Sequence, residues 1–250
     1  MTVYDAAFFA ALRGGSSRSA NAIVPFLIET IAPRSVVDVG CGTGAWLASF
    51  KIHGVTDVVG LDGPYVRAGD LLVDPEEFIA ADLCKPLPLH RRFDLATSFE
   101  VAEHLPETVA LQFVGGLTRL APVVAFSAAI PFQGGTGHVN EQWPSYWAAA
   151  FWQFGYEPLD IVRPRIWGDP NVEFWYAQNM LLFIHRDRLA ADATLRTIAE
   201  LCPRTPLDVV HPALYAQCER RVTGVRRSLG RTMHEMRQSL TRVTKRRPSP

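Results

Sequence analysis

The sequence predicts an α/β fold, a doubly wound parallel sheet with helices on both faces. Two observations support this prediction. Short apolar runs rich in β-branched residues alternate with helical segments up to about residue 185, an order typical of such sheets. The first of these runs leads directly into a glycine-rich turn that opens a helix. The 250 residues, 48% hydrophobic and 20% charged, have the composition of one globular domain with extensions.

The helices and strands can be placed in chain order. Val36, Val37 and Val39 give the first strand the β-branched run of an interior strand, and Pro106 suits the first turn of a helix. We expect strands at 35–39, 57–61, 77–81, 93–98, 122–129, 156–163 and 178–185. We expect helices at 19–31, in spite of Pro25, and at 44–53, 106–119 and 143–154.

Three segments are expected: an N-terminal helical cap at 1–32, the sheet domain at 33–187 and a C-terminal helical extension at 188–250. The extension should hold helices at 190–201 and 211–243. Along the second helix, apolar residues recur every three or four positions: Val222, Val225, Leu229, Met233, Met236, Leu240 and Val243. This stripe predicts packing or a homodimer through the helix. Residues 219–250 also hold ten Lys or Arg and two Glu, so attraction to a polyanion or to the acidic body is an alternative.

The glycine-rich turn is built to hold a ligand. Gly40, Gly42 and Gly44 let the backbone turn sharply and approach a ligand where a Cβ would collide. The turn also fits the dinucleotide pattern G-x-G-x-x-G/A, with Asp62 about twenty residues further on. Asp38, two residues before the first glycine, would repel a pyrophosphate. It favours a cationic ligand such as S-adenosylmethionine, which carries a sulfonium and an amino group.

Four ordered motifs resemble the class I S-adenosylmethionine-dependent methyltransferases: Val-Asp-Val-Gly-Cys-Gly-Thr-Gly at 37–44, Leu61-Asp62, Ala81-Asp82-Leu83 and residues 93–105. The resemblance implies a seven-stranded Rossmann-like methyltransferase sheet with an antiparallel edge from the last two strands. It also implies that the glycine turn holds the methionine part, Asp62 the ribose hydroxyls, and Asp82 with Leu83 the adenine. Ser98 and Glu100, where strand 93–98 ends, complete the expected cofactor site. The alternative is that Asp62 and Asp82 only cap turns.

Two segments carry the chemistry that methyl transfer to a hydroxyl requires. Glu100-Val-Ala-Glu103-His104 follows strand 93–98, and a glycine-rich loop with His138 and Glu141 follows strand 122–129. We expect both to overlook one pocket, because an open α/β sheet binds ligands at the carboxyl ends of its strands. His138, Glu141 and His104 are the candidate catalytic residues, with His138 suited to act as a general base.

A divalent cation that stabilises an alkoxide is the alternative to a base. Glu100, Glu103, His104 and His138 resemble the metal-binding E-x-x-E-H plus distant His of the Hen1-type RNA terminal 2′-O-methyltransferases. Such carboxylate and imidazole ligands accept Mg²⁺ or another divalent cation. Glu-Val-Ala-Glu-His is also a common turn of metal-free members of the superfamily. The sequence leaves both interpretations open.

The segment 137–183 combines aromatic residues with amides, acids and arginines, as carbohydrate sites often do. Its aromatic side chains include Trp143, Tyr146, Trp147, Trp152, Trp167, Trp175 and Tyr176, of which we expect Trp147 and Trp152 to lie in the core. Arg163, Arg165, Glu173, Gln178 and Asn179 do not fit a core.

This block resembles bacterial sugar O-methyltransferases, among them the mycobacterial enzymes that methylate methylmannose polysaccharide. The resemblance implies transfer to a sugar or oligosaccharide hydroxyl, such as the 1-hydroxyl of a 3-O-methylated mannoside. A phenol or quinone acceptor and a Hen1-like RNA 2′-O-methyltransferase are the alternatives. Nucleic acid is not the expected partner, because the loops lack a cluster of basic residues to hold phosphates.

The remaining composition narrows the class of protein. Cys41, Cys84, Cys202 and Cys218 form no C-x-x-C pair, which argues against a structural zinc site or a disulfide framework. No apolar run approaches the ~20 residues that span a bilayer, and the N-terminus lacks the basic start of a signal peptide. We therefore expect a cytoplasmic enzyme without a membrane span.

Overall fold

The computed structural model describes residues 6–202 and 205–223, with side chains from residue 14 onward. The chain divides into two units, residues 1–211 and 212–250. In the second unit, residues 212–223 are helical. The rest of the helix expected at 211–243, and with it most of the apolar stripe proposed for a homodimer, lies outside the described residues.

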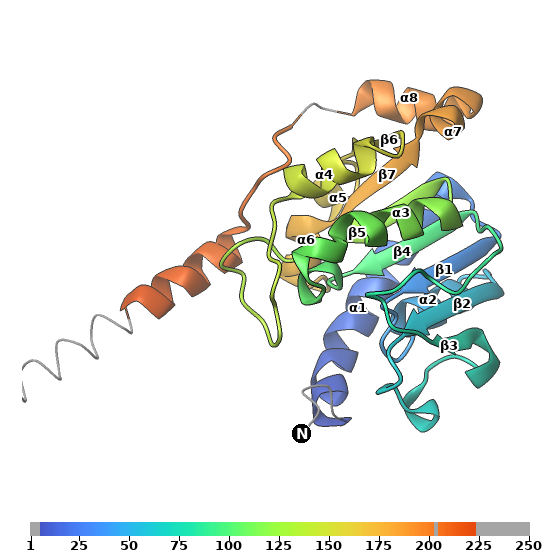
Figure 1. Cartoon of the computed structure of the whole chain (residues 1–250). Helices are drawn as coiled ribbons and strands as arrows, with labels where there is room; N and C mark the ends of the chain where they lie inside the picture. Colours follow the sequence, from blue (N-terminus) through green and yellow to red (C-terminus); the bar gives the residue numbers. More distant parts are fainter. Residues whose placement is uncertain (1–5, 203–204, 224–250) are drawn as a thin grey trace, which may run out of the picture. The chain divides into compact units, whose positions relative to one another are not determined.

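A seven-stranded sheet forms the centre of the first unit (Figure 1), with the strand order β3-β2-β1-β4-β5-β7-β6. The strands are β1 (Ser35–Val39), β2 (Asp57–Asp62), β3 (Phe78–Ala80), β4 (Leu95–Phe99), β5 (Val123–Ser127), β6 (Tyr156–Leu159) and β7 (Leu181–His185). β7 runs antiparallel between β5 and β6, whereas the pairings among β1 to β5 are parallel. The predicted fold class, a doubly wound sheet with an antiparallel edge, is confirmed.

Alternate residues of the central strands face two separate hydrophobic clusters, as the pleat of a strand requires. Val36 belongs to the cluster under α1 (Ala6–Ile31) and α2 (Ala45–Ile52), and its neighbour Val37 to the cluster under α3 (Ala110–Leu120) and α4 (Pro144–Trp152). Figure 1 shows α3 in front of the sheet. Because both faces are covered, the central strands read as nearly continuous apolar runs in the sequence.

The remaining helices are short and lie late in the first unit: α5 (Arg163–Ile166), α6 (Phe174–Asn179), α7 (Arg186–Ala191) and α8 (Ala193–Leu201). Single 3-10 turns occur at Ala68–Asp70, Pro75–Glu77, Ala102–His104 and Glu107–Val109. The first helix is longer than the expected 19–31, since α1 begins at Ala6. None of the helices in the described part of the chain has the length and apolar character needed to cross a bilayer.

The strands of the edge pair are shorter than their apolar patterns predict. β6 ends at Leu159 because Asp160 turns to form a buried ion pair with Arg163, the first residue of α5. Arg163 is buried, with an exposed fraction of 2%. Its guanidinium also donates hydrogen bonds to the carbonyl oxygens of Gln178 and Leu207. The prediction that Arg163 lies outside the core is therefore wrong. Arg163 instead fastens the segment 205–211 to the sheet domain.

Candidate active site

The carboxyl ends of the parallel strands meet at one edge of the sheet, where the glycine turn follows β1. Gly40, Gly42 and Gly44 all have positive φ, at 86°, 53° and 83°. The side chain of Val101 lies so close to Gly40 that a Cβ there would be 2.2 Å from it. The amides of Gly40 and Cys41 both donate to the carbonyl oxygen of Leu61, at 2.7 and 3.1 Å. The turn is therefore a left-handed loop fixed against β2, which only glycine at Gly40 permits.

Asp38 lies in β1, directly before this turn, with an exposed fraction of 1%. Its Oδ1 accepts a hydrogen bond of 2.8 Å from the Thr97 hydroxyl, and its Oδ2 has no hydrogen-bond partner among the described residues. Burial raises the pKa of Asp38 from 3.8 to about 7, with the nearby Asp62 adding to the shift. A buried carboxyl group with one unsatisfied oxygen is suited to a cationic ligand, which would favour its ionised form.

Asp62 ends β2 and faces the glycine turn, as expected. Its Oδ2 accepts from the Gly42 amide at 2.6 Å, while its Oδ1 accepts from the Gly63 amide, also at 2.6 Å, and from the Tyr65 hydroxyl. Burial raises the pKa of Asp62, which these hydrogen bonds partly offset. Because a carboxylate offers about four acceptor sites, room for a ligand hydroxyl remains mainly on Oδ2. Sequence reasoning missed Tyr65, which competes for the carboxylate that we expect to bind ribose.

The other expected cofactor residues differ in their surroundings. Asp82 is exposed, and its carboxylate accepts from the Cys84 amide at 3.0 Å and lies 3.3 Å from Lys85 Nζ. These interactions hold the pKa of Asp82 below its usual value. Leu83 is 8% exposed and packs in the core. The hydroxyl of Ser98 is buried in β4 and has no hydrogen-bond partner among the described residues.

Glu100 follows β4 in a left-handed conformation, with φ of 55°, which is rare for a residue other than glycine. Its carboxylate accepts from the amide of Gln133 at 2.8 Å and from that of Asn179 at 3.1 Å. Burial raises the pKa of Glu100, which both hydrogen bonds partly offset. Nothing in the sequence indicated that either amide contacts Glu100, because Gln133 lies in the loop after β5 and Asn179 at the end of α6. Backbone strain held by such a network often marks a functional site.

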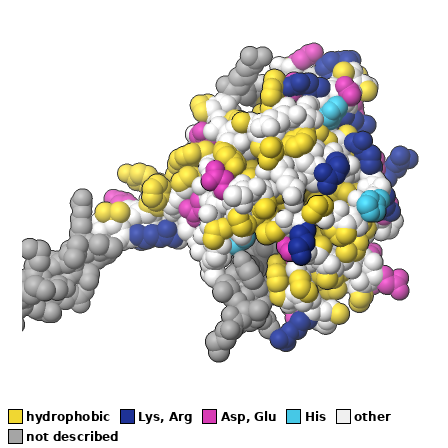
Figure 2. Space-filling view, in the orientation of Figure 1, with side chains coloured by type: hydrophobic (Ala, Val, Ile, Leu, Met, Phe, Trp, Pro, Cys, Tyr) yellow, Lys and Arg dark blue, Asp and Glu magenta, His cyan; other side chains and the backbone are white. Residues whose placement is uncertain are grey.

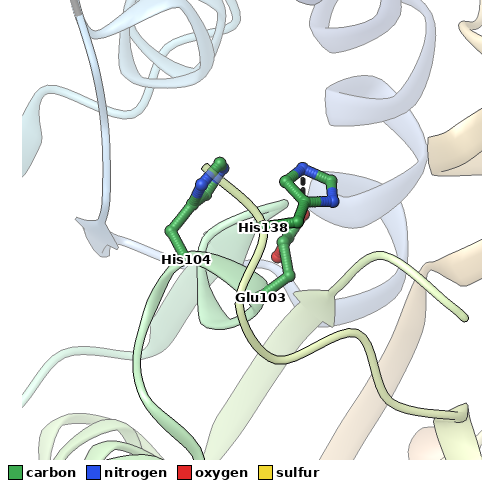
Figure 3. Close-up of side chains that lie close together, drawn as sticks. All are labelled: Glu103, His104 and His138. Carbon is green, nitrogen blue, oxygen red and sulfur yellow. Dashed lines mark ion pairs between the residues drawn. The ribbon is translucent and has the colours of Figure 1, made fainter. Parts of the chain in front are cut away.

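The two expected catalytic segments do come together. Phe99 pairs with Ser127 across β4 and β5, so the chain leaves both strands at the same level of the sheet. The carbonyl oxygen of Glu103 then accepts from the amides of Val139 and Asn140, at 2.8 and 3.0 Å. This bridge brings the side chains of Glu103, His104 and His138 together, and Figure 3 shows the two imidazole rings beside each other with Glu103 next to His138.

Glu103 is fully buried, and neither of its carboxylate oxygens has a hydrogen-bond partner among the described residues. Burial, together with repulsion from Glu100, raises its pKa well above the ordinary value. The Oε1 atom lies 4.0 Å from His138 Nε2. His104 stands edge-on to the His138 ring at 4.8 Å between centroids, and burial with the neighbouring His138 lowers its pKa to about 4. His104 is therefore neutral at physiological pH.

His138 is held in place by Glu141. The Nδ1 atom of His138 lies 2.9 Å from Glu141 Oε1, and the same carboxylate accepts from the amides of Phe132 and Gly134 at 2.9 and 2.8 Å. Glu141 thus orders the turn before His138. With a proton on Nδ1, the lone pair of Nε2 is free to accept a proton.

Three of the four residues expected to bind a metal could hold one. Glu103, His104 and His138 offer ligand atoms that all lie within 4.8 Å of one another. The unsatisfied, buried oxygens of Glu103 fit a cation, and the contact of His138 with Glu141 is typical of a metal-ligating histidine. Glu100 lies outside this group, since its carboxylate is bound to amides. A divalent cation here would stabilise a developing alkoxide.

The aromatic side chains of the segment 137–183 divide between the core and the surface. Trp147 is 2% exposed, as expected, but Trp152 is 56% exposed and lies under the Arg186 guanidinium, so its assignment to the core is wrong. Gln178 and Asn179 are buried, contrary to expectation, because they bond to Gln133 and to each other. The large apolar side chains exposed near His138 are instead Phe132, at 80%, and Val139, at 67%.

Comparisons with known proteins agree with the fold. Residues 13–111, from α1 to the start of α3, match the model of a family described as a methyltransferase domain. This region contains the glycine turn, Asp62 and the segment from Glu100 to His104. No curated protein sequence matches the chain.

Several solved structures share the fold at low sequence identity. The sugar N-methyltransferase KedS8 from Streptoalloteichus has a TM-score of 0.54 and 20% identity, covering 74% of this chain and 97% of its own. CalS10, an amino pentose methyltransferase from Micromonospora echinaspora, has a TM-score of 0.53 and 17% identity, covering 74% and 99%. The magnesium protoporphyrin IX methyltransferase ChlM from Synechocystis has a TM-score of 0.52 and 16% identity, covering 74% and 90%. The fold is that of the Rossmann-like methyltransferases.

Proposed function

We propose that this protein transfers a methyl group from S-adenosylmethionine to a hydroxyl group of a sugar or oligosaccharide. The glycine turn between Asp38 and Asp62 supports the cofactor, because buried acids beside a left-handed loop suit a positively charged nucleoside. ChlM, which has the same fold, is described with bound S-adenosylmethionine or S-adenosylhomocysteine. The family match of residues 13–111 supports methyl transfer.

The pairing of His138 with Glu141 is the observation that carries the choice of a hydroxyl acceptor. A sugar hydroxyl is a very weak acid, so its attack on the methyl group requires a group that takes the proton. His138 Nε2 is that group, because Glu141 holds the other ring nitrogen at 2.9 Å. The bound cofactor supplies the electrophilic methyl group of its sulfonium, and the protein aligns the acceptor oxygen with it.

A sugar acceptor is supported by the loop after β5 and by the relatives with this fold. Phe132, 80% exposed beside the Glu141 carboxylate, offers an apolar face on which a sugar ring can stack. KedS8 and CalS10 are described as a sugar and an amino pentose methyltransferase. The 1-hydroxyl of a 3-O-methylated mannoside is the first acceptor to try, on the resemblance of the sequence to bacterial sugar O-methyltransferases.

A second mechanism for the same reaction is favoured by the unsatisfied oxygens of Glu103. In it, Glu103, His104 and His138 would hold a divalent cation that lowers the pKa of the acceptor hydroxyl. The two mechanisms share the acceptor and the cofactor but differ in their need for metal.

Transfer of radiolabelled methyl groups to a panel of acceptors tests the function. The panel contains neutral mono- and oligosaccharides with 3-O-methylmannosides, simple phenols and a short RNA. We expect label on a sugar, dependent on His138. Label on the phenols alone would replace the sugar acceptor, and label on RNA alone would support a Hen1-like reaction.

A further inference from the structure

A cavity lies at the opposite edge of the sheet from the candidate active site. It has a volume of about 560 Å³. Pro122, directly before β5, and His185, the last residue of the antiparallel β7, line it together with Tyr156 at the start of β6. These positions mark the edge where the parallel strands begin, one strand length away from Glu100 and Ser127. The cavity is therefore separate from the site proposed for methyl transfer.

Three arginines line this cavity: Arg92, Arg119 and Arg188. Asp187 is the one acidic residue in the lining, so the cavity has a net positive charge. Lys and Arg side chains gather on the right-hand side of Figure 2, where α7 and the end of α3 lie in Figure 1. An excess of basic groups around a concave site attracts anions.

The bonding of these arginines leaves them able to bind a ligand. Arg92 and Arg119 make no hydrogen bond or ion pair with any described residue. Arg188 pairs through Nη2 with Asp192 at 2.9 Å, but its Nε is buried without a hydrogen-bond partner in the described part of the chain. Arginines that serve only to stabilise the fold, such as Arg163, have their donors occupied.

The apolar wall of the cavity is fixed in position. The Tyr156 hydroxyl lies 2.8 Å from the carbonyl oxygen of Thr118 and 2.6 Å from that of Ala121, at the end of α3. The His185 ring stands edge-on to Tyr156 at 5.2 Å, and Phe154 is 36% exposed at the rim. The lining thus contains both ring side chains and guanidinium groups.

We propose that this cavity binds a small molecule in which a phosphate group is attached to a ring, such as a sugar phosphate or a nucleotide. Guanidinium groups bind the phosphate oxygens through paired hydrogen bonds, and the side chains of Phe154 and His185, which are partly exposed, contact the ring. The volume suits such a ligand, whereas inorganic phosphate alone would leave most of it empty. Because the cavity is remote from the glycine turn, the ligand is neither the methyl donor nor the acceptor.

Isothermal titration calorimetry of the full chain in a phosphate-free buffer tests this proposal. Glucose 6-phosphate and AMP are titrated in parallel, with glucose and adenosine as their uncharged counterparts. We expect binding of at least one phosphate compound at one site per chain, with a weaker response to its uncharged counterpart. Each titration is repeated with saturating S-adenosylhomocysteine, so that AMP bound at the cofactor site is not counted.

Charge reversal locates the binding. Arg92→Glu and Arg119→Glu should each weaken binding of the phosphate compound at least about tenfold, since each removes a charge-assisted contact. Arg34→Glu is the matched control, because Arg34 is 93% exposed before β1, at the same edge of the sheet but outside the cavity. The affinity of Arg34→Glu for the phosphate compound should stay unchanged, and circular dichroism should show that all three variants are folded.

Two results would overturn the proposal: no binding of either phosphate compound at millimolar concentration, or binding that Arg92→Glu and Arg119→Glu leave unchanged. The glucose 6-phosphate titration does not depend on the cofactor site. A protein that fails to bind S-adenosylhomocysteine would therefore contradict the proposed function and still allow the cavity to be tested.

Discussion

The Nδ1 atom of His138 lies 2.9 Å from Oε1 of Glu141, three residues further along the same loop. This contact sets the orientation of the imidazole and directs Nε2 toward Glu103 at 4.0 Å. The Glu141 carboxylate also accepts hydrogen bonds from two backbone amides of the preceding turn, so one carboxylate orders both the histidine and its loop. The catalytic role proposed for His138 rests on this arrangement.

Replacement of His138 should stop methyl transfer without disturbing the cofactor. We expect His138→Ala to lower kcat by about 10²- to 10⁴-fold, the usual contribution of a general base. Glu141→Gln should cause a smaller loss, because the amide oxygen can still accept from Nδ1. Calorimetry with S-adenosylhomocysteine should give the wild-type affinity for both variants. A near-normal rate in His138→Ala would place the base elsewhere.

Removal of divalent cations separates the two mechanisms. Proton removal by His138 alone predicts full activity after dialysis against EDTA, and this is the result we expect. A loss of at least about tenfold that Mg²⁺ restores would instead assign the activation of the hydroxyl to a cation on Glu103, His104 and His138. In that case Glu103→Gln should bind Mn²⁺ more weakly than wild type, as measured by calorimetry.

Asp38 should make the stability of the cofactor-free protein depend on pH. The pKa of Asp38 is about 7 in the folded state, compared with an ordinary value of 3.8 for the unfolded chain. The folded state therefore binds the proton more tightly than the unfolded state. The resulting stability is fully present below pH 3.8 and is lost as pH rises through about 7, amounting to a few kcal/mol over this range. Urea unfolding at pH 5 and pH 8 measures the loss, which Asp38→Asn should reduce. An identical loss in Asp38→Asn would reject this assignment.

The same group should couple cofactor affinity to pH. S-adenosylmethionine is a cation and favours ionised Asp38, so its affinity should increase between pH 6 and pH 8 in the wild type. Asp38→Asn should bind more weakly at pH 8 and lose most of this dependence. Calorimetric titrations at the two pH values give the comparison. A pH-independent affinity in the wild type would show that Asp38 does not interact with the cofactor.

Asp62 should contribute to cofactor binding because its Oδ2 atom can accept a further hydrogen bond. We expect Asp62→Ala to weaken binding of S-adenosylhomocysteine by a few kcal/mol, on the order of 1.5–3 kcal/mol for each hydrogen bond to a charged acceptor. Tyr65→Phe is the matched control, because it removes the competing hydroxyl and leaves the carboxylate in place. It should bind as tightly as wild type or more tightly. Unchanged affinity in Asp62→Ala would remove Asp62 from the cofactor site.

Arg163 should be important for stability and not for catalysis. Arg163→Met leaves Asp160 buried without its ion-pair partner, which typically costs about 3–5 kcal/mol of unfolding free energy. Arg186→Met breaks the exposed pair with Glu157 and should change the free energy by about 1 kcal/mol or less. Urea denaturation compares the two variants. Equal effects would show that burial of the Arg163 pair is unimportant.

The fold could be predicted from the sequence because its central strands are covered on both faces. Runs such as Val36 to Val39 then contain only apolar residues apart from Asp38, and the glycine turn marks where β1 ends. The antiparallel strands β6 and β7 at the edge of the sheet were harder to predict. Asp160, directly after β6, pairs with Arg163 at the start of α5 and so ends the strand, and nothing in the apolar pattern indicates that contact.

The site could be predicted where its residues are close in the chain or follow neighbouring strands. Glu103, His104 and His138 meet because β4 and β5 pair in register, which parallel topology implies. The partners of Glu100 could not be predicted in the same way. Gln133 and Asn179 lie 33 and 79 residues away in the chain, and tertiary packing brings the loop after β5 and the end of α6 to the carboxylate.

A crystal structure of the protein grown with S-adenosylhomocysteine tests the central claim most directly. We expect the ligand to occupy the turn from Gly40 to Gly44, with its amino group near Asp38 and its ribose near Asp62. An empty turn, or a ligand bound elsewhere while this turn stays unchanged, would contradict the account.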